Sequence, residues 1–211
     1  MTWIDGDDGS RIELASAGRA LGDASEGYES GDFHVATSFD GGFLVAAIDG
    51  LGHGTEAAVA SRAAAEVLEA HAGESISLLV QRCHERLRKT RGAAMSLARL
   101  NVRDSSMIWG GIGDVEAVLV RSDSLADRRM EHIGLRGGVV GYVMPSVKET
   151  GIDVSTGDTL IMATDGIASR FADDLSIGST PQMIAESILA RHGRDNDDAL
   201  VVVARYFGAM S

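Results

Sequence analysis

A disulfide framework is excluded for this 211-residue chain, because Cys83 is its single cysteine. The two prolines form no Pro-rich linker, and we find no repeat with a period of roughly 20–50 residues. The apolar runs are too short to cross a bilayer. The acidic N-terminus, MTWIDGDDGSRIE, lacks the basic and apolar parts of a signal peptide. We therefore expect a single domain over residues 1–211 in the cytoplasm, with no membrane partner.

Positive charge is also scarce: the chain has 19 Lys and Arg residues and 31 Asp and Glu residues, which give a formal net charge of −12. This balance argues against nucleic acid or an anionic membrane as the main partner. An apolar content of 45% is that of a globular protein. The acidity fits a protein that binds cations or docks on a basic surface, although acidic charge often serves solubility alone.

The order of the expected elements indicates an α+β fold. Helices are expected from Thr55, from about Ser75, and over Pro181–His192, so they cluster after the early strands and near the end of the chain. A long all-β middle argues against alternating βαβ units and for two mainly antiparallel sheets with helices outside. Strands are expected at residues 11–17, 33–39, 43–48, 94–102, 106–109, 116–121, 130–133, 159–163 and 199–206.

Three helical patterns carry specific expectations. In the Ser75 helix, apolar residues that include Cys83 recur at helical spacing and predict one buried face. Thr55 is expected to cap the first helix. In the last helix, Pro181 is expected at the start and Gly193 at the end. Its expected apolar face consists of Met183, Ile184, Ile188 and Leu189.

Aspartates stand at the ends of several apolar strands. Asp49-Gly50 and Asp165-Gly166 each follow such a strand, Asp32 precedes one, and Asp195, Asp197 and Asp198 precede the last. If these strand ends meet, the carboxylates raise one another's pKa unless cations neutralise them. Mg²⁺ or Mn²⁺, with oxygen ligands and several waters, does this well. Two such ions can activate water and clamp a phosphoryl group.

A simpler interpretation remains open, because Asp-Gly is a common turn dipeptide and a single occurrence is more often a turn than a ligand. The chain has two matched units in which Asp-Gly follows an apolar strand, together with an acidic group before the last strand. It is harder to explain all of these as simple turns. Calcium loops of the EF-hand type are excluded, because neither DGDDGS nor DNDDAL fits their pattern.

Six segments occur in the order found in a known family: GDF, AAIDGLGHGTEAAVAS, TRGAAMSLARL, GGIGDV, MATDGI and DNDDALVVVAR. From about Gly31 to Arg205 the chain resembles the metal-dependent serine/threonine phosphatases of type 2C. Within them it resembles the bacterial branch of SpoIIE- and RsbU-type regulators and is most similar to RsbX-type stressosome phosphatases. The resemblance implies a four-layer α-β-β-α sandwich of two mainly antiparallel sheets flanked by helices.

The resemblance also implies a centre of two divalent metal ions, Mn²⁺ or Mg²⁺. Asp49 matches the aspartate that bridges the ions, and Gly50 offers a backbone carbonyl. Asp165 and Asp197 match further ligands, and Asp32 matches the early aspartate that binds through water. Asp49 and Asp165 are the residues on which catalysis is expected to depend, with a metal-activated water attacking phosphorus and no phosphoenzyme.

Five other residues are weaker candidates. His53 is a possible general acid for the leaving alkoxide, although a histidine in a glycine-rich loop is more often structural or exposed. Asp195 and Asp198 are possible accessory residues or simply solvated. Asp114 stands where the family usually has asparagine, and a turn residue is the alternative. Arg19 matches the family's phosphate-binding arginine poorly, so phosphate binding is expected to rest on the metals.

The leading hypothesis is a protein phosphatase acting on phosphoserine or phosphothreonine of phosphorylated stress-signalling regulators, of the stressosome scaffold or sensor type. A catalytically weak or inactive binding module with the same fold is the alternative from another class. Retention of Asp32, Asp49, Asp165 and Asp197 argues against that module. A hydrolase of small phosphoesters is a third hypothesis, which fits less well because few residues could recognise a small substrate.

Overall fold

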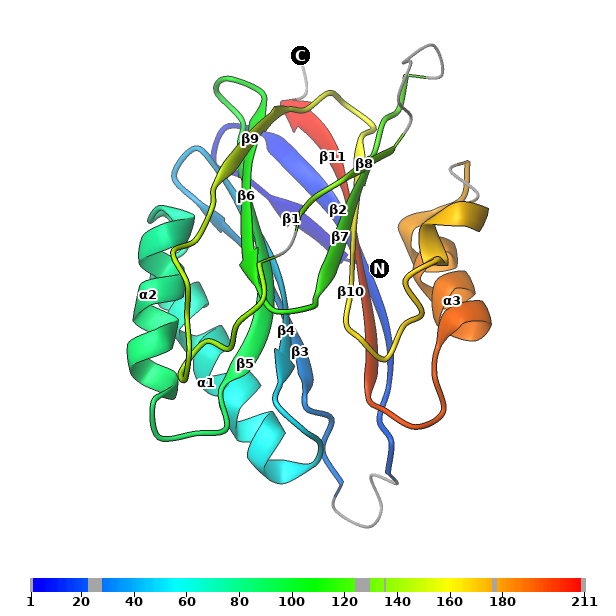
Figure 1. Ribbon diagram of the computed structural model, residues 1–211. Coiled ribbons are helices and arrows are strands. Elements are labelled where there is room, and N and C mark those ends of the chain that lie inside the picture. The colour runs from blue at the N-terminus through cyan, green and yellow to red at the C-terminus, as the bar shows by residue number, and fades with distance from the viewer. Residues whose placement is uncertain (1, 23–27, 124–129, 135, 176–177, 210–211) are drawn as a thin grey trace.

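The computed structural model describes residues 2–22, 28–123, 130–134, 136–175 and 178–209. Two antiparallel sheets lie face to face at its centre (Figure 1). The six-stranded sheet has the order β1-β2-β11-β10-β7-β8 and the five-stranded sheet the order β3-β4-β5-β6-β9. The first consists of β1 (Thr2–Asp5), β2 (Ser10–Arg19), β11 (Ala199–Ala209), β10 (Thr159–Ala163), β7 (Glu116–Val120) and β8 (Met130–His132). The second consists of β3 (Asp32–Phe39), β4 (Gly42–Gly50), β5 (Ala93–Asn101), β6 (Ser106–Ile112) and β9 (Thr150–Asp153).

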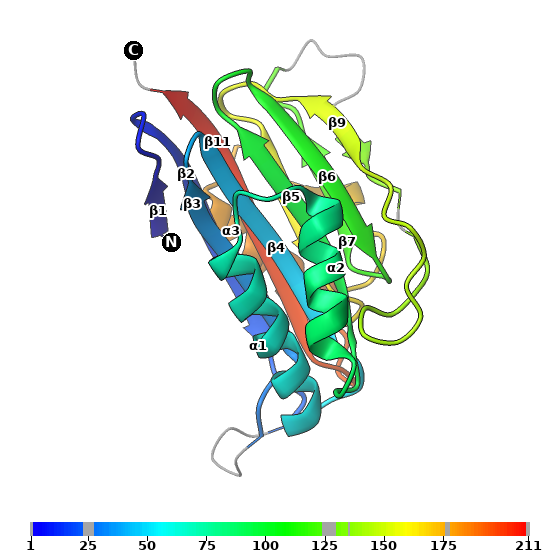
Figure 2. The same cartoon turned by 90° about the vertical axis from the view of Figure 1, so that its left-hand side faces the viewer.

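Helices cover both outer faces of this pair of sheets. The helices α1 (Thr55–Ala70) and α2 (Ile76–Leu87) lie across the five-stranded sheet, as Figure 2 shows. The helix α3 (Pro181–His192) and the short 3₁₀ helix η2 (Phe171–Asp174) cover the six-stranded sheet. The predicted α-β-β-α sandwich is therefore confirmed. No helix of the described ranges is both long and apolar enough to span a membrane.

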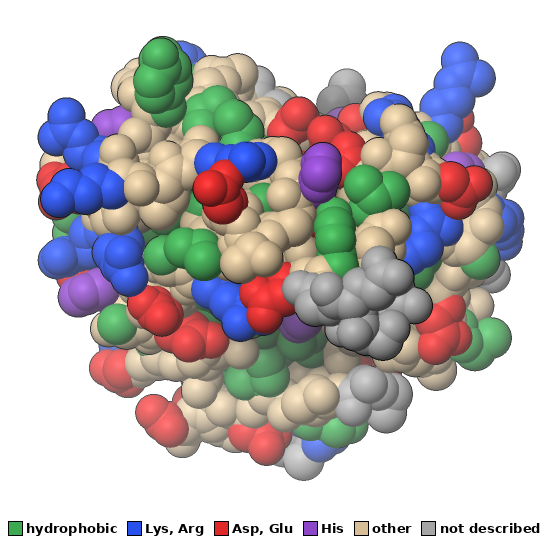
Figure 3. Space-filling view, turned by 90° about the horizontal axis from the view of Figure 1, so that it is seen from below, with side chains coloured by type: hydrophobic (Ala, Val, Ile, Leu, Met, Phe, Trp, Pro, Cys, Tyr) green, Lys and Arg blue, Asp and Glu red, His purple; other side chains and the backbone are tan. Residues whose placement is uncertain are grey.

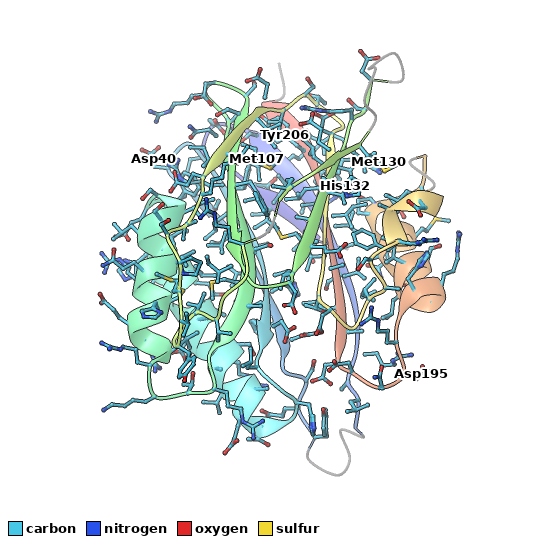
Figure 4. All side chains as sticks on the ribbon, in the orientation of Figure 1. Asp40, Met107, Met130, His132, Asp195 and Tyr206 are labelled. Atoms are coloured by element: carbon cyan, nitrogen blue, oxygen red, sulfur yellow. The ribbon has the colours of Figure 1, made fainter. Side chains whose placement is uncertain are left out.

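The central strands are buried on both faces, because side chains of a strand alternate between its two faces. In β4, Val45 belongs to the core between the sheets, and Leu44 to the core beneath α1 and α2. In β11, Val202 faces the other sheet and Val203 faces α3. The inter-sheet core also holds Met107 and Tyr206, which Figure 4 labels near its upper end.

The helix ends follow most of the expectations. Ser75 caps α2 by accepting a hydrogen bond from Leu78 N–H, and Cys83 lies on the buried face as predicted. The predicted Thr55 cap is wrong: Gly54 is the N-cap, with φ of 76°, and Thr55 is the first helical residue. A glycine adopts this left-handed conformation without the strain that a side chain would add.

Three expectations differ from the structure for physical reasons. The strands β1 and β9 were not predicted, because each has four residues and little apolar alternation. Met183 does not join the buried face of α3, since it is 58% exposed.

Candidate metal centre

Asp49 lies at the end of β4, on the face turned toward the other sheet. Val45 and Ala47 belong to the inter-sheet core, and strand alternation carries the same face on to Asp49. Asp32 is its direct partner across the β3–β4 pair. Side chains opposed in this way have Cβ atoms about 4.5–5.5 Å apart. The two carboxylates therefore lie side by side at one edge of the five-stranded sheet.

Thr164, which follows β10, connects Asp32 to the opposite sheet. Leu160 and Met162 face the inter-sheet core, and alternation places Thr164 on that face as well. Its hydroxyl donates a hydrogen bond to Oδ2 of Asp32 at 2.8 Å and accepts one from the backbone N–H of Leu200 at 2.9 Å. Thr164 is only 1% exposed. Thr164 was not among the predicted site residues, although a threonine that follows an apolar strand and directly precedes Asp165 is a usable signal in the sequence.

The turn after β10 comes unusually close to the segment before β11. A Cβ on Gly166 would lie 1.8 Å from the carbonyl oxygen of Asp198, so only glycine permits this approach. The Arg194 N–H donates to the carbonyl oxygen of Gly166 at 2.7 Å. This contact brings Asp165 next to Asp197, although 31 residues separate them in the sequence.

A second close approach shapes the turn after β4. A Cβ on Gly50 would lie 2.2 Å from the carbonyl oxygen of Ala57 in α1. Gly52 and Gly54 then adopt φ values of 85° and 76°, in the left-handed region that favours glycine. These glycines let the chain pass from β4 into α1 directly beside Asp49.

Crowding and burial raise the pKa values of three carboxyl groups in this centre. Burial, followed by the charges of Asp198, Asp165 and Asp197, raises the pKa of Asp32 to about 7, and the Thr164 hydrogen bond opposes the rise. Burial and the neighbouring aspartates also raise the pKa of Asp49. For Asp165 burial again raises the pKa, with the Asp197 and Asp114 charges adding to it. The centre is a group of like charges that a cation would stabilise.

The donor set fits a hydrated hard ion. Within the described ranges, no three Asp, Glu, His or Cys side chains stand close enough to hold one ion by themselves. That argues against a zinc-type site, which needs at least three protein ligands. Magnesium is usually bound by one or two carboxylates and several waters. Oxygen donors with raised pKa values are consistent with that kind of site.

The three aspartates before β11 have different surroundings. Asp197 is half-buried, accepts a hydrogen bond from Asp198 N–H at 2.9 Å, and acts electrostatically on Asp165. Asp195 forms an ion pair with Arg19 at 3.0 Å, with its side chain 96% exposed. Figure 4 shows it below the end of α3, beside the space between the sheets rather than in it.

Asp198 is neither solvated nor free to move toward an ion. It is 3% exposed, and its carboxylate accepts hydrogen bonds from Leu21 N–H and Gly31 N–H, each at 2.7 Å, and from the Tyr28 hydroxyl at 3.2 Å. These contacts fix the chain that leads into β3, and hence the start of the strand that carries Asp32. Asp198 is a structural anchor of the centre.

The remaining candidates lie around the edge of the centre. His53 is exposed, and its ring stacks on Tyr28 with centroids 6.4 Å apart. Asp114 is exposed and contributes to the raised pKa of Asp165, so it belongs to the group of carboxylates and is more than a turn residue. Arg91, in the loop before β5, is not one of these candidates and forms an ion pair with Glu56 at 2.5 Å.

A cavity of about 230 Å³ opens beside Asp165. Its polar lining includes Asp114, Thr164 and Arg194. Figure 3 shows this lower end of the molecule, where acidic and basic side chains lie among apolar ones. The arrangement offers carboxylates for cations and one guanidinium for an anion in the same space.

Known proteins resemble the chain in sequence. Residues 40–207 match the protein family described as Stage II sporulation protein E (SpoIIE). The chain is also 28% identical to the phosphoserine phosphatase RsbX of Bacillus subtilis (strain 168) over 89 residues. That alignment covers 42% of this chain and 45% of RsbX, so it spans less than half of either protein.

Solved structures resemble it over a greater length. A structure from a study of the bacterial stressosome as a modular system for the control of secondary messenger signalling is 26% identical, with a TM-score of 0.79, and the match covers 92% of this chain and 99% of that one. A crystal structure of RsbX in complex with magnesium has a TM-score of 0.77 over 97% of this chain and 98% of its own, at 19% identity. The second likeness speaks for the fold alone.

Proposed function

Because this chain belongs to the SpoIIE family, we propose that it is a metal-dependent protein phosphatase that hydrolyses phosphoserine or phosphothreonine. The observation that carries the proposal is the meeting of Asp32 and Asp49 from one sheet with Asp165 from the other. Their raised pKa values, caused by burial and mutual repulsion, fit a centre built for divalent cations. The similarity to RsbX, a phosphoserine phosphatase, supports the same reaction.

The proposed cofactor is a pair of Mg²⁺ or Mn²⁺ ions. Asp49 would hold both ions, with the backbone carbonyl of Gly50, Asp165 and Asp197 as further ligands and Asp32 acting through water. The oxygen-only donor set supports this assignment. So does the magnesium in the RsbX crystal structure with the same fold. When bound, such ions withdraw charge from phosphoryl oxygens and make a coordinated water more acidic.

The chain's own contribution is to hold its carboxylates in place. β4 is buried on both faces and holds Asp49 rigidly at its end, while Thr164 orients Asp32 by a hydrogen bond of 2.8 Å. Water attacks phosphorus and the serine or threonine oxygen leaves, so no protein nucleophile is needed. Cys83 supports this scheme, because it is fully buried and burial raises its pKa to about 12. His53 as the proton donor to the leaving oxygen stays a hypothesis.

The proposed substrates are phosphorylated regulators of the stressosome scaffold or sensor type, encountered in the cytoplasm. The likeness to a structure from stressosome work, at 26% identity over 92% of this chain, supports this choice. Because this chain has a net charge of −12, a partner protein with a basic surface would be electrostatically complementary to it.

Hydrolysis of p-nitrophenyl phosphate and of a phosphoserine peptide, with Mg²⁺, with Mn²⁺ and with chelator, tests the proposal. We expect activity only with metal. Asp49→Asn and Asp165→Asn should each lower kcat/KM more than about 100-fold, since even outer partners of metal ligands are worth about 10–100-fold. Asp195→Asn, which removes an exposed charge from the same region, is the matched control and should keep activity.

Metal-independent hydrolysis, or full activity in both variants, would contradict the proposed centre. A wild-type protein that binds metal and phosphoprotein but turns over neither substrate would instead be the inactive binding module. The lack of a preformed three-residue ligand set in the described ranges is the observation that keeps this second candidate in view.

A further inference from the structure

An arginine side chain lines the cavity beside Asp165 and has no role in the proposed reaction so far. Its charged lining residues are the carboxylates Asp114, Glu116 and Asp165, and one guanidinium, Arg194. Ile167 and Phe171 close its apolar side. A doubly negative phosphoester that enters a space with three carboxylates needs positive charge on more than one side.

Arg194 is held firmly at its backbone. Its N–H donates to the Gly166 carbonyl oxygen at 2.7 Å, directly after Asp165. Its carbonyl oxygen accepts a hydrogen bond from the Arg19 guanidinium. These two contacts fix where the Arg194 side chain starts, within the turn that also carries Asp195 and Asp197.

The Arg194 guanidinium is not used in an ion pair within the described part of the chain. The nearest carboxylate in sequence, Asp195, is already paired with Arg19 at 3.0 Å. Arg194 instead acts on Asp165 through its charge. Arg91, another arginine near the centre, is paired with Glu56. Among the described arginines, Arg194 alone lines the cavity that holds Asp165.

We propose that Arg194 binds the phosphoryl group of the substrate, with its guanidinium donating to two phosphoryl oxygens. The inference rests on the proposed phosphatase function. A planar guanidinium matches two phosphate oxygens at once, which a lysine does not. Arg19, the poor match to the family's phosphate-binding arginine, instead donates a hydrogen bond to the Arg194 carbonyl oxygen.

A phosphate-binding role differs measurably from a structural one. If Arg194 serves the substrate, its removal weakens phosphate binding and leaves metal binding unchanged or tighter, because a positive charge beside Asp165 is lost. If Arg194 only positions Asp165, its removal weakens metal binding. The two effects have opposite signs for the metal, so one variant separates the two roles.

The test measures binding of inorganic phosphate to the Mg²⁺-loaded protein, and of Mg²⁺ to the metal-free protein, by calorimetry. We expect Arg194→Gln to weaken phosphate binding roughly 10-fold to 100-fold, the range of a lost charge-assisted contact. The KM for p-nitrophenyl phosphate should rise as well, and Arg194→Lys should recover part of both losses. Arg191→Gln is the matched control, because Arg191 on α3 lines the neighbouring cavity between α3 and η2.

Equal losses in Arg191→Gln and Arg194→Gln would overturn the proposal, since the effect would then be one of overall charge. Unchanged phosphate binding in Arg194→Gln, or weakened Mg²⁺ binding, would overturn it too. Should Arg194→Gln fail to fold, Arg194→Lys carries the comparison. If the wild type binds phosphate through Arg194 yet hydrolyses no phosphoester, the proposed function fails and the Arg194 site stands.

Discussion

At the upper end of the sandwich, the turn between β9 and β10 buries Asp158, which is 2% exposed. Its carboxylate forms an ion pair with Arg121 at 3.0 Å and accepts the backbone N–H groups of Ser122 and Ser155, at 2.7 Å and 3.0 Å. At the lower end, Asp49 is largely buried as well. There its neighbours are Asp32 and other carboxylates, and no ion pair to Asp49 forms within the described ranges.

The two ends differ in the partners that surround their buried carboxylates. A carboxylate supplied with an arginine and backbone donors is stable as the protein stands, so the upper cluster serves the fold. A group of carboxylates that repel one another is costly until a cation arrives, which is why we propose that the lower cluster binds cations. The same residue type, at the ends of strands in the same sandwich, therefore has two roles that its partners decide.

Breaking the upper cluster should have the largest effect on stability. Arg121→Met leaves Asp158 buried and unpaired, so we expect a loss of about 3–5 kcal/mol of unfolding free energy. Urea denaturation measures it, and phosphatase activity per folded molecule should not change. The double variant Arg121→Met/Asp158→Leu should regain only part of the loss. It removes the unpaired charge of Asp158, but the backbone N–H groups of Ser122 and Ser155 lose their acceptor and Glu131 loses Arg121. A single variant as stable as the wild type would show that the upper pair is not needed.

The lower cluster should make the metal-free protein less stable as pH rises. The pKa of Asp32 is raised from 3.8 to about 7 in the folded state. Its contribution is therefore complete below about pH 4 and is lost as pH rises through about 7. Asp32→Asn should gain on the order of 2–4 kcal/mol over the wild type at about pH 8, roughly a third of that at about pH 5, and little below about pH 4. Thermal unfolding without metal measures the difference.

Saturating Mg²⁺ should remove this pH dependence, since the ion supplies the charge that the carboxylates lack. The wild-type Tm should then rise more with Mg²⁺ at the higher pH. If the metal-free Asp32→Asn variant has the same Tm as the wild type at both pH values, carboxylate repulsion does not destabilise the lower cluster. The proposed difference between the two clusters would then be wrong.

The smallest predicted effect concerns the hydrogen bond between the sheets. Thr164→Val removes the donor that orients Asp32, so Mg²⁺ affinity should fall about 10-fold, as for other partners of metal ligands. Thr164→Ser keeps the hydroxyl and should bind Mg²⁺ like the wild type. Calorimetric titration compares the three proteins. Equal loss in the valine and serine variants would assign the effect to packing rather than to the hydrogen bond.

The sequence by itself determined the features that depend on neighbouring residues. The buried face of α2 followed from apolar periodicity, which is a local property. The order of the elements indicated two mainly antiparallel sheets with helices outside, and the family resemblance implied the four-layer α-β-β-α sandwich. The apolar run of β4 predicted a strand covered on both faces, and the structure confirms it. The assignment of Asp32, Asp49, Asp165 and Asp197 as ligands came from motifs and stays a prediction until metal binding is measured.

Only the tertiary structure decided which aspartate does what. Asp195 and Asp198 stand three positions apart, yet one pairs with Arg19 at the surface and the other anchors the chain before β3. The Thr164–Asp32 bond joins residues 132 positions apart, and Arg194 meets Asp165 because Gly166 allows a close approach. Such contacts depend on how distant strands pair and how two sheets face each other, which no local pattern encodes.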